Sequence, residues 1–109
     1  MNDGQYEIVL YRLKPGADRD RFLATSAQAT VWLRQCDGYL GRELLADQGQ
    51  WVDIVRWVSL DDALATGEAF IQTPVASDFM SAVEPESVMS AAAPWTTRNV
   101  RAPSVSPVP

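Results

Sequence analysis

The stretch WVDIVRWV, residues 51–58, is rich in aromatic and β-branched residues and predicts a β-strand. Successive side chains of a strand point to opposite faces of the sheet. One face carries Trp51, Asp53, Val55 and Trp57, and the other carries Val52, Ile54, Arg56 and Val58. Because neither face is purely polar, we expect both faces of this strand to be covered.

The segments on either side of this strand complete a recognisable order of elements. Patterning predicts strands over Tyr6–Leu13 and Tyr39–Asp47, a helix over Asp18–Gln35, a helix that starts after Ser59, a shorter helix over Val75–Val83 and a last strand within Val88–Val100. The two main helices and four strands follow the order βαββαβ. This order predicts an α+β, ferredoxin-like fold, with a four-stranded antiparallel sheet and helices on one face.

The face of the sheet that the helices leave open is expected to be apolar. Val52, Ile54 and Val58 lie on one side of the third strand, and Ile8 and Leu10 alternate along the first. An apolar uncovered face needs a partner, and the same face of a second copy is the simplest one. We therefore expect a homodimer.

Composition limits the chemistry that this chain can perform. The chain has 109 residues, a formal net charge of −5, one cysteine and no histidine. The acidic balance disfavours a nucleic-acid partner, and the missing histidine excludes His-based catalysis, His metal sites and His-ligated haem. We expect one domain over residues 1–101 and an extended Pro/Ser-rich tail over residues 102–109. No apolar run suits a membrane span or signal peptide, so we expect a cytoplasmic protein.

Three short motifs mark the ends of the predicted elements. They are WLRQ at 32–35, DGY at 37–39, and WVS at 57–59 before a helix that contains Ala63. In this order and spacing they resemble the antibiotic biosynthesis monooxygenase family, which usually has Pro-Gly-Phe where this chain has DGY. The resemblance covers roughly residues 6–83. It implies a dimeric α+β barrel with a pocket in each subunit between the sheet and its helices.

The resemblance also implies an activity. The family includes oxygenases without a cofactor that convert aromatic polyketide anthrones to quinones, with molecular oxygen as co-substrate. We therefore expect a cofactor-independent monooxygenase that acts on an aromatic, phenolic or anthrone-like substrate. A cyclase or isomerase on the same barrel, or a non-catalytic small-molecule-binding dimer, is the alternative.

The candidate catalytic residues are Trp57, Asp53 and Tyr11. Trp57 matches the family tryptophan that lines the pocket, although it could equally anchor the core. Asp53 shares its strand face, where burial would make it a candidate proton acceptor. The alternatives are an ion pair with an arginine such as Arg42 or Arg12, or a solvated position at a strand edge. Tyr11 enters the pocket only if its face of the first strand looks toward the helices.

Further side chains are expected to bind the substrate, with ordinary core packing as the alternative. They are Trp51, Val55, Phe70, Phe79, Met80 and Trp95. We expect Trp32, which lies at the flank of the apolar stripe of its helix, at the surface or in a dimer contact. Asp61-Asp62 fits helix capping better than metal binding, so no metal site is expected.

Overall fold

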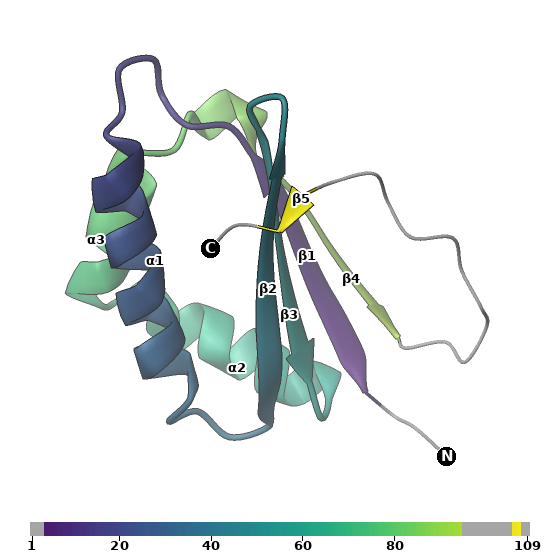
Figure 1. The fold of residues 1–109 in the computed structure, drawn as a ribbon. Helices are drawn as coiled ribbons and strands as arrows, with labels where there is room; N and C mark the ends of the chain where they lie inside the picture. The colour runs from purple at the N-terminus through teal and green to yellow at the C-terminus, as the bar shows by residue number, and fades with distance from the viewer. Residues whose placement is uncertain (1–3, 95–105, 108–109) are drawn as a thin grey trace.

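A computed structural model describes residues 4–94 and 106–107 of the chain (Figure 1). The strands are β1 (Gln5–Tyr11), β2 (Tyr39–Asp47), β3 (Gln50–Trp57), β4 (Met89–Pro94) and β5 (Ser106–Pro107). The helices are α1 (Arg19–Leu33), α2 (Leu60–Phe70) and α3 (Pro74–Ser81), with a short 3₁₀ helix over Pro85–Ser87. All strand pairs are antiparallel, and the strands lie in the order β4-β1-β3-β2-β5.

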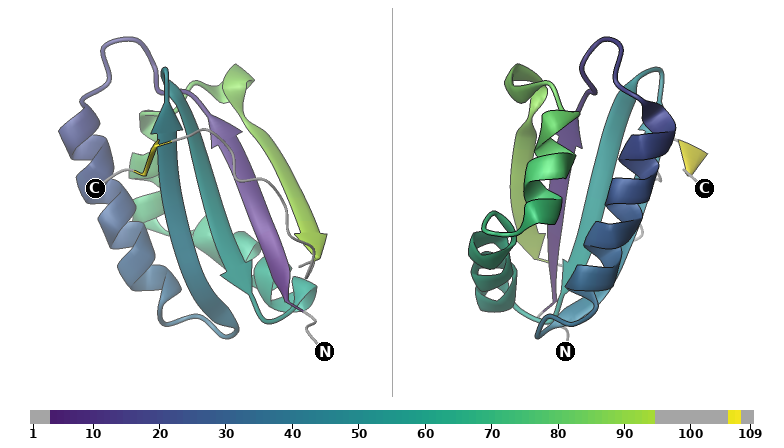
Figure 2. Two further views of the ribbon diagram at one scale, coloured as in Figure 1. Left: turned by 45° about the vertical axis from the view of Figure 1, so that its right-hand side comes forward. Right: turned by 90° about the vertical axis from the view of Figure 1, so that its left-hand side faces the viewer.

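The three α-helices lie against one face of the sheet, and the opposite face carries no helix (Figure 2). The α+β, ferredoxin-like fold predicted from the sequence is therefore confirmed. The expected four strands are present, but the sheet has a fifth strand, β5. This two-residue strand pairs with Leu45 and Ala46 at the outer edge of β2.

The helices begin where the local sequence supplies a capping side chain. Asp18, Ser59 and Thr73 each accept a hydrogen bond from the backbone N–H three residues later, at the starts of α1, α2 and α3. Pro74 occupies the first turn of α3, where its missing N–H costs nothing. These caps explain why the predicted helix boundaries agree closely with those observed.

Three residues in two of the turns, two of them glycines, have a left-handed backbone conformation. Gly38 has φ = 79° after α1, as expected for a helix that ends in a left-handed residue. In the β2–β3 hairpin, Gln48 (φ = 50°) and Gly49 (φ = 81°) are both left-handed. Positive φ at both central residues of a two-residue loop matches the right-handed twist of the strands.

β1 differs from its predicted extent, whereas β2 has its predicted bounds but an irregular register. β1 ends at Tyr11, and Leu13 makes only an isolated bridge with Val83. The interruption follows from Arg12, whose backbone N–H donates to the Ser87 hydroxyl rather than to a neighbouring strand. In β2 the register shifts between Tyr39 and Gly41, and a glycine inside a strand often marks such an irregularity.

The alternation predicted for residues 51–58 is confirmed on its helix-facing side. Trp51, Asp53, Val55 and Trp57 are all buried beneath the helices. The core has two parts that this strand joins. One gathers Tyr11, Phe22, Trp51, Phe79 and Val83, and the other gathers Leu33, Val55, Trp57 and Ala63.

Trp32, expected at the surface or in a dimer contact, is partly buried within the chain. Its ring lies 5.3 Å from the ring of Phe70, and it packs against the second core cluster. The helical stripe from Phe22 to Leu33 did not predict this contact because α2 approaches the flank of α1 rather than its centre.

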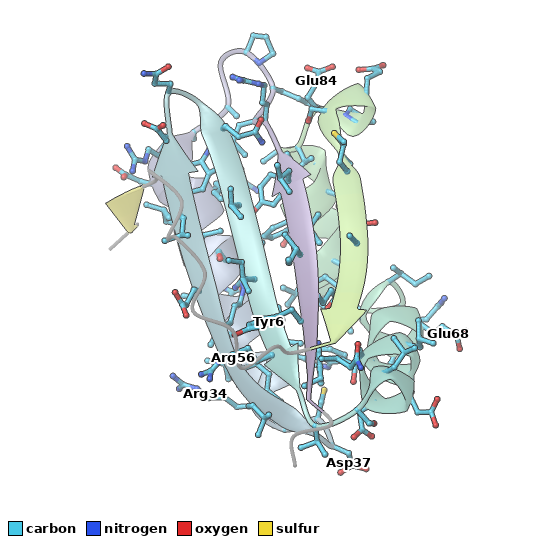
Figure 3. The ribbon with its side chains drawn as sticks, turned by 90° about the vertical axis from the view of Figure 1, so that its right-hand side faces the viewer. Tyr6, Arg34, Asp37, Arg56, Glu68 and Glu84 are labelled. Carbon is cyan, nitrogen blue, oxygen red and sulfur yellow. The ribbon has the colours of Figure 1, made fainter. Side chains whose placement is uncertain are left out.

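The open face of the sheet mixes polar and apolar side chains. Figure 3 shows Tyr6 and Arg56 on this face, where they are cross-strand partners of β1 and β3. Two residues farther along β1, Ile8 pairs with Ile54 of β3. Tyr6, Arg56, Ile8 and Ile54 are all partly buried. Among the described residues, no helix is long and apolar enough to cross a bilayer.

Candidate active site

A cavity of about 190 Å³ lies between the sheet and the helices that cover it. Its lining is mainly apolar and comes from β1, β2, β3 and all three α-helices. The lining residues are Glu7, Val9, Tyr11, Ala29, Leu33, Arg42, Asp53, Val55, Trp57, Thr66, Gly67, Phe70, Phe79 and Met80. Met80 is 47% exposed, so the cavity reaches the surface beside α3.

A buried ion pair forms part of the cavity wall. The Arg42 guanidinium donates from Nε to Asp53 Oδ1 at 2.8 Å and from Nη2 to Oδ2 at 2.6 Å. The two side chains are 6% and 11% exposed. This bidentate geometry is the strong form of an arginine–carboxylate contact. It confirms the pairing with Arg42 that the sequence left open as one alternative for Asp53.

The same arginine ties the sheet to α1. Its Nη1 donates to the Ser26 carbonyl at 2.8 Å and to the Thr30 hydroxyl at 2.9 Å. Burial alone would lower the pKa of Arg42, but its hydrogen bonds to Asp53 and the charge of Asp53 raise it overall. Arg42 therefore stays charged, and with Asp53 it makes an electrically neutral unit.

Tyr11 extends this network. Its hydroxyl donates to Asp53 Oδ2 over a long 3.4 Å, and its ring packs edge-on against Phe22 and Phe79. Burial, followed by the charge of Asp53, raises the pKa of Tyr11 far above its usual range. Tyr11 therefore remains a neutral phenol that can donate or accept a hydrogen bond at the cavity surface.

The second carboxylate of the cavity has a different environment. Glu7 Oε1 accepts a hydrogen bond from the indole N–H of Trp57 at 3.2 Å. Of the residues that the structure describes, none places a cation within ion-pair distance of Glu7. Burial raises the pKa of Glu7, the Trp57 hydrogen bond opposes this, and the charge of Asp53 adds to the increase. Glu7 is thus a carboxyl group that can take up and release a proton.

Most of the sequence-predicted site residues come together at this cavity. Seven of them are in its lining: Tyr11, Asp53, Val55, Trp57, Phe70, Phe79 and Met80. Trp51 is not part of the lining. Its ring packs 4.9 Å from Phe22 in the first core cluster, with the Arg19 guanidinium 5.5 Å above it. Trp95 lies outside the described residues.

Sequence reasoning did not assign a role to several lining residues. Among them are Glu7 on β1 and Thr66 and Gly67 on α2. The strand signal for Glu7 was present, because residues 7, 9 and 11 must share a face. Its contact with Trp57 depends on how β1 pairs with β3, which no short turn fixes.

The cavity combines an apolar enclosure with a neutral ion pair (Arg42 and Asp53), the Glu7 carboxyl group outside that pair, and the Tyr11 hydroxyl. Such a site can bind a flat, uncharged molecule, accept a proton from it and exclude water from the resulting anion. Within residues 4–94 and 106–107, no three side chains of His, Cys, Asp or Glu gather as a metal site would require.

Neither a protein-family model nor a curated protein sequence matches this chain. Solved structures do. SnoaB from Streptomyces nogalater, described as a cofactor-independent oxygenase, matches at 14% identity with a TM-score of 0.65, over 90% of this chain and 96% of SnoaB. A candidate antibiotic biosynthesis monooxygenase from Bordetella bronchiseptica matches at 19% identity and a TM-score of 0.65, over 87% of this chain and 99% of that one.

A third similar structure has a different activity. Hydroxynitrile lyase from Passiflora edulis matches at 14% identity with a TM-score of 0.68, over 92% of this chain and all of the lyase chain. Proteins of this fold thus include both an oxygenase and a lyase, so the fold alone does not identify an activity. Taken together, the sheet order, the helix placement and these matches show that the chain has the fold of the antibiotic biosynthesis monooxygenase proteins.

Proposed function

We propose that this protein is a monooxygenase that needs no metal or organic cofactor and oxidises an uncharged phenolic or anthrone-like substrate to a quinone. The observation that carries the proposal is Glu7, a carboxyl group held in an apolar cavity by the Trp57 indole N–H. The oxygenase SnoaB, which has the same fold, supports the reaction class.

Glu7 is a better proton acceptor than Asp53, the candidate that the sequence analysis named for this role. Both oxygens of Asp53 already accept hydrogen bonds from Arg42, and Oδ2 also accepts one from Tyr11. A proton taken up by Asp53 would break this buried pair. Glu7 accepts one hydrogen bond from Trp57, and its second oxygen is left for a substrate proton.

The reaction balances with molecular oxygen as the only co-substrate. Glu7 accepts a proton from the acidic C–H of an anthrone, and the carbanion that forms is an electron-rich enolate. One electron passes to O₂, and the two radicals combine to a carbon–oxygen bond, which gives a peroxide that Glu7 protonates. Loss of the second C–H proton and of hydroxide, which together make water, leaves the quinone carbonyl.

The other cavity residues position the substrate. Trp57 offers a ring face for stacking and holds the Glu7 carboxyl, and the Tyr11 hydroxyl can donate to the substrate oxygen that becomes negative. Because the Arg42–Asp53 pair has no net charge, it does not offset the negative charge of an ionised Glu7. A substrate that enters as an anion would therefore be repelled by the Glu7 carboxylate. This arrangement favours a substrate that enters uncharged and becomes an anion only inside the cavity.

Oxygen uptake by chelator-treated protein tests this proposal. A panel of anthrones and hydroquinones is supplied, and the quinone formed is followed by its absorbance. We expect oxygen consumption matched by quinone, lost in Glu7→Gln and kept in Glu43→Gln, which changes an exposed carboxylate of β2. Uptake that stays at the uncatalysed rate across the panel would contradict an oxygenase acting on these substrates.

A second candidate function is acid–base catalysis without oxygen, as in a lyase, a cyclase or an isomerase. The specific observation in its favour is again Glu7, since proton transfer alone requires nothing more from the site. The hydroxynitrile lyase neighbour has this fold. Turnover that is equal with and without oxygen identifies this class, and ligand binding without any turnover identifies a binding protein.

We further propose that the protein acts as a cytoplasmic homodimer through the open face of the sheet. Val58 and Met89 are 51% and 69% exposed, and the cross-strand pair Ile8 and Ile54 is only partly buried. Light scattering during gel filtration should give twice the chain mass, and Ile54→Glu should give the mass of one chain. A monomeric wild-type protein would contradict the dimer.

A further inference from the structure

Gly67 lies on the inner side of α2. Residues 63, 66, 67 and 70 follow helical spacing, and Ala63 and Thr66 are buried while Phe70 packs on Trp32. Glu68, the next residue, projects away from the helix into solvent (Figure 3). Any side chain at position 67 would thus point toward the sheet.

The space in front of Gly67 is empty. A Cβ atom built on Gly67 has no heavy atom of another residue within 4 Å, although Gly67 lines the cavity. By contrast, a Cβ on Gly41 would lie 2.6 Å from the Arg56 guanidinium. A side chain at position 41 would therefore require the Arg56 side chain to move, whereas nothing in the packing requires a glycine at position 67.

Helix stability does not favour Gly67 either. Glycine in a helix interior loses more backbone freedom on folding than alanine does, and the φ of Gly67 is not in the left-handed region. A residue that costs stability and fills no structural need is expected where function needs the room.

The size of the cavity indicates what the room is for. Its volume is about 190 Å³. An apolar cavity of about 150 Å³ is known to bind benzene, so the enclosed part of this cavity takes little more than one ring. A substrate with three fused rings must extend past α2, toward the part of the lining where Met80 is exposed.

We propose that Gly67 determines substrate size, by leaving a slot in α2 through which the second and third rings of a fused aromatic substrate extend. The choice of aromatic ligands rests on the proposed function. The slot itself rests on the geometry of α2, and it can be tested by binding without turnover.

The test compares Gly67→Ala and Gly67→Val with Ala69→Val, a change on the exposed side of the same helix. The probes are 9-anthrone, with three rings, and hydroquinone, with one, each titrated without oxygen and followed by calorimetry. We expect Gly67→Val to weaken anthrone binding by at least about tenfold and hydroquinone binding by less than about twofold, since overpacking penalises only the ligand that fills the slot.

The thermal stability of Gly67→Ala gives an independent readout. We expect its melting temperature to rise by roughly 2–6 °C, because alanine is the better helix former. Equal affinity of Gly67→Val and wild type for anthrone would overturn the proposal, and so would equal losses for both probes. Binding that behaves as expected in a protein that consumes no oxygen would contradict the oxygenase function and leave the slot in place.

Discussion

The two carboxylates of the cavity, Asp53 and Glu7, stand on neighbouring strands of one sheet but differ in what surrounds them. Asp53 is locked by two hydrogen bonds from Arg42, which also holds α1 through Ser26 and Thr30. Glu7 meets an indole N–H and an apolar wall. The difference teaches that burial alone does not make a carboxylate reactive. Its partners decide whether it serves the fold or the chemistry.

This comparison predicts that the loss of Asp53 and the loss of Glu7 have different effects on the protein. Loss of Asp53 should damage folding first, because a buried arginine is left without its counter-charge. Loss of Glu7 should damage turnover and leave the fold intact, because a neutral group is better accommodated in an apolar cavity than a carboxylate.

The largest expected effect is that of Asp53→Asn on stability. Because the Arg42 side chain is only 6% exposed, we expect the variant to lose about 3–5 kcal/mol of unfolding free energy, as for a broken buried pair. Urea denaturation measures this loss. The double change Arg42→Met with Asp53→Leu should recover most of it, and a loss below about 1 kcal/mol would place the pair with exposed ion pairs.

Next in size is the effect of Glu7→Gln on turnover. Removing the proton acceptor should lower kcat about 100-fold, which corresponds to about 2.7 kcal/mol of activation free energy. The exposed Glu43→Gln is the matched control. Steady-state kinetics with the best substrate of the panel measures the loss, and undiminished kcat in Glu7→Gln would move the role of proton acceptor elsewhere.

Glu7 should also leave a signature in the pH dependence of stability. Its pKa in the folded chain is raised above 4.5, mainly by burial, so the folded state binds more protons than the unfolded state above pH 4.5. The contribution of Glu7 to stability is therefore full below pH 4.5 and is lost as the pH rises through the raised pKa. The melting temperatures of wild type and Glu7→Gln should diverge over that pH range. Melting temperatures that change in parallel with pH would contradict a raised pKa of Glu7.

A smaller effect is expected for Trp57→Phe. The variant keeps an aromatic ring but loses the N–H that stabilises the Glu7 carboxylate, so the pKa of Glu7 should rise further. One charge-assisted hydrogen bond contributes about 1.5 kcal/mol, which corresponds to a shift of about one unit in the pKa of Glu7. On the acidic side of the pH–rate profile this shift lowers kcat/KM roughly tenfold. The pH–rate profile should shift to higher pH, and a uniform loss at every pH would indicate a packing role only.

The smallest effect is expected for Tyr11→Phe. The hydrogen bond from Tyr11 to Asp53 is long, 3.4 Å, and Arg42 satisfies the carboxylate without it. We expect less than about 1 kcal/mol of stability to be lost. A larger change in KM than in kcat would show that the hydroxyl binds substrate, and a loss of several kcal/mol would make Tyr11 an essential part of the buried network.

Local signals made most of the fold predictable. The caps at Asp18, Ser59 and Thr73 and the left-handed Gly38 are encoded within a few residues, and the structure has each of them. The alternation in residues 51–58 likewise predicted that Asp53 shares a face with Trp51, Val55 and Trp57, but it did not decide whether Asp53 is buried, as the structure shows it to be. The fifth strand was not predictable, because two residues in a Pro/Ser-rich tail carry no strand pattern.

Register decides how much of the site could be predicted. The two-residue loop at Gln48-Gly49 fixes the register of the β2–β3 hairpin and places Leu44 opposite Asp53. In this register Arg42 and Asp53 are diagonal neighbours. Their pairing could therefore be anticipated from the hairpin. The contact of Glu7 with Trp57 joins strands that are far apart in the sequence. No turn fixes that register, so Glu7 emerges only from the folded chain.

The most direct measurement is a ¹³C NMR titration of the Glu7 side-chain carboxyl, identified as the signal that Glu7→Gln removes. It requires no substrate and observes the free carboxylate itself. We predict a midpoint above 4.5 in the wild-type protein and a still higher one in Trp57→Phe. A midpoint at or below 4.5, unchanged by Trp57→Phe, would contradict the assignment of Glu7 as the proton acceptor of this cavity.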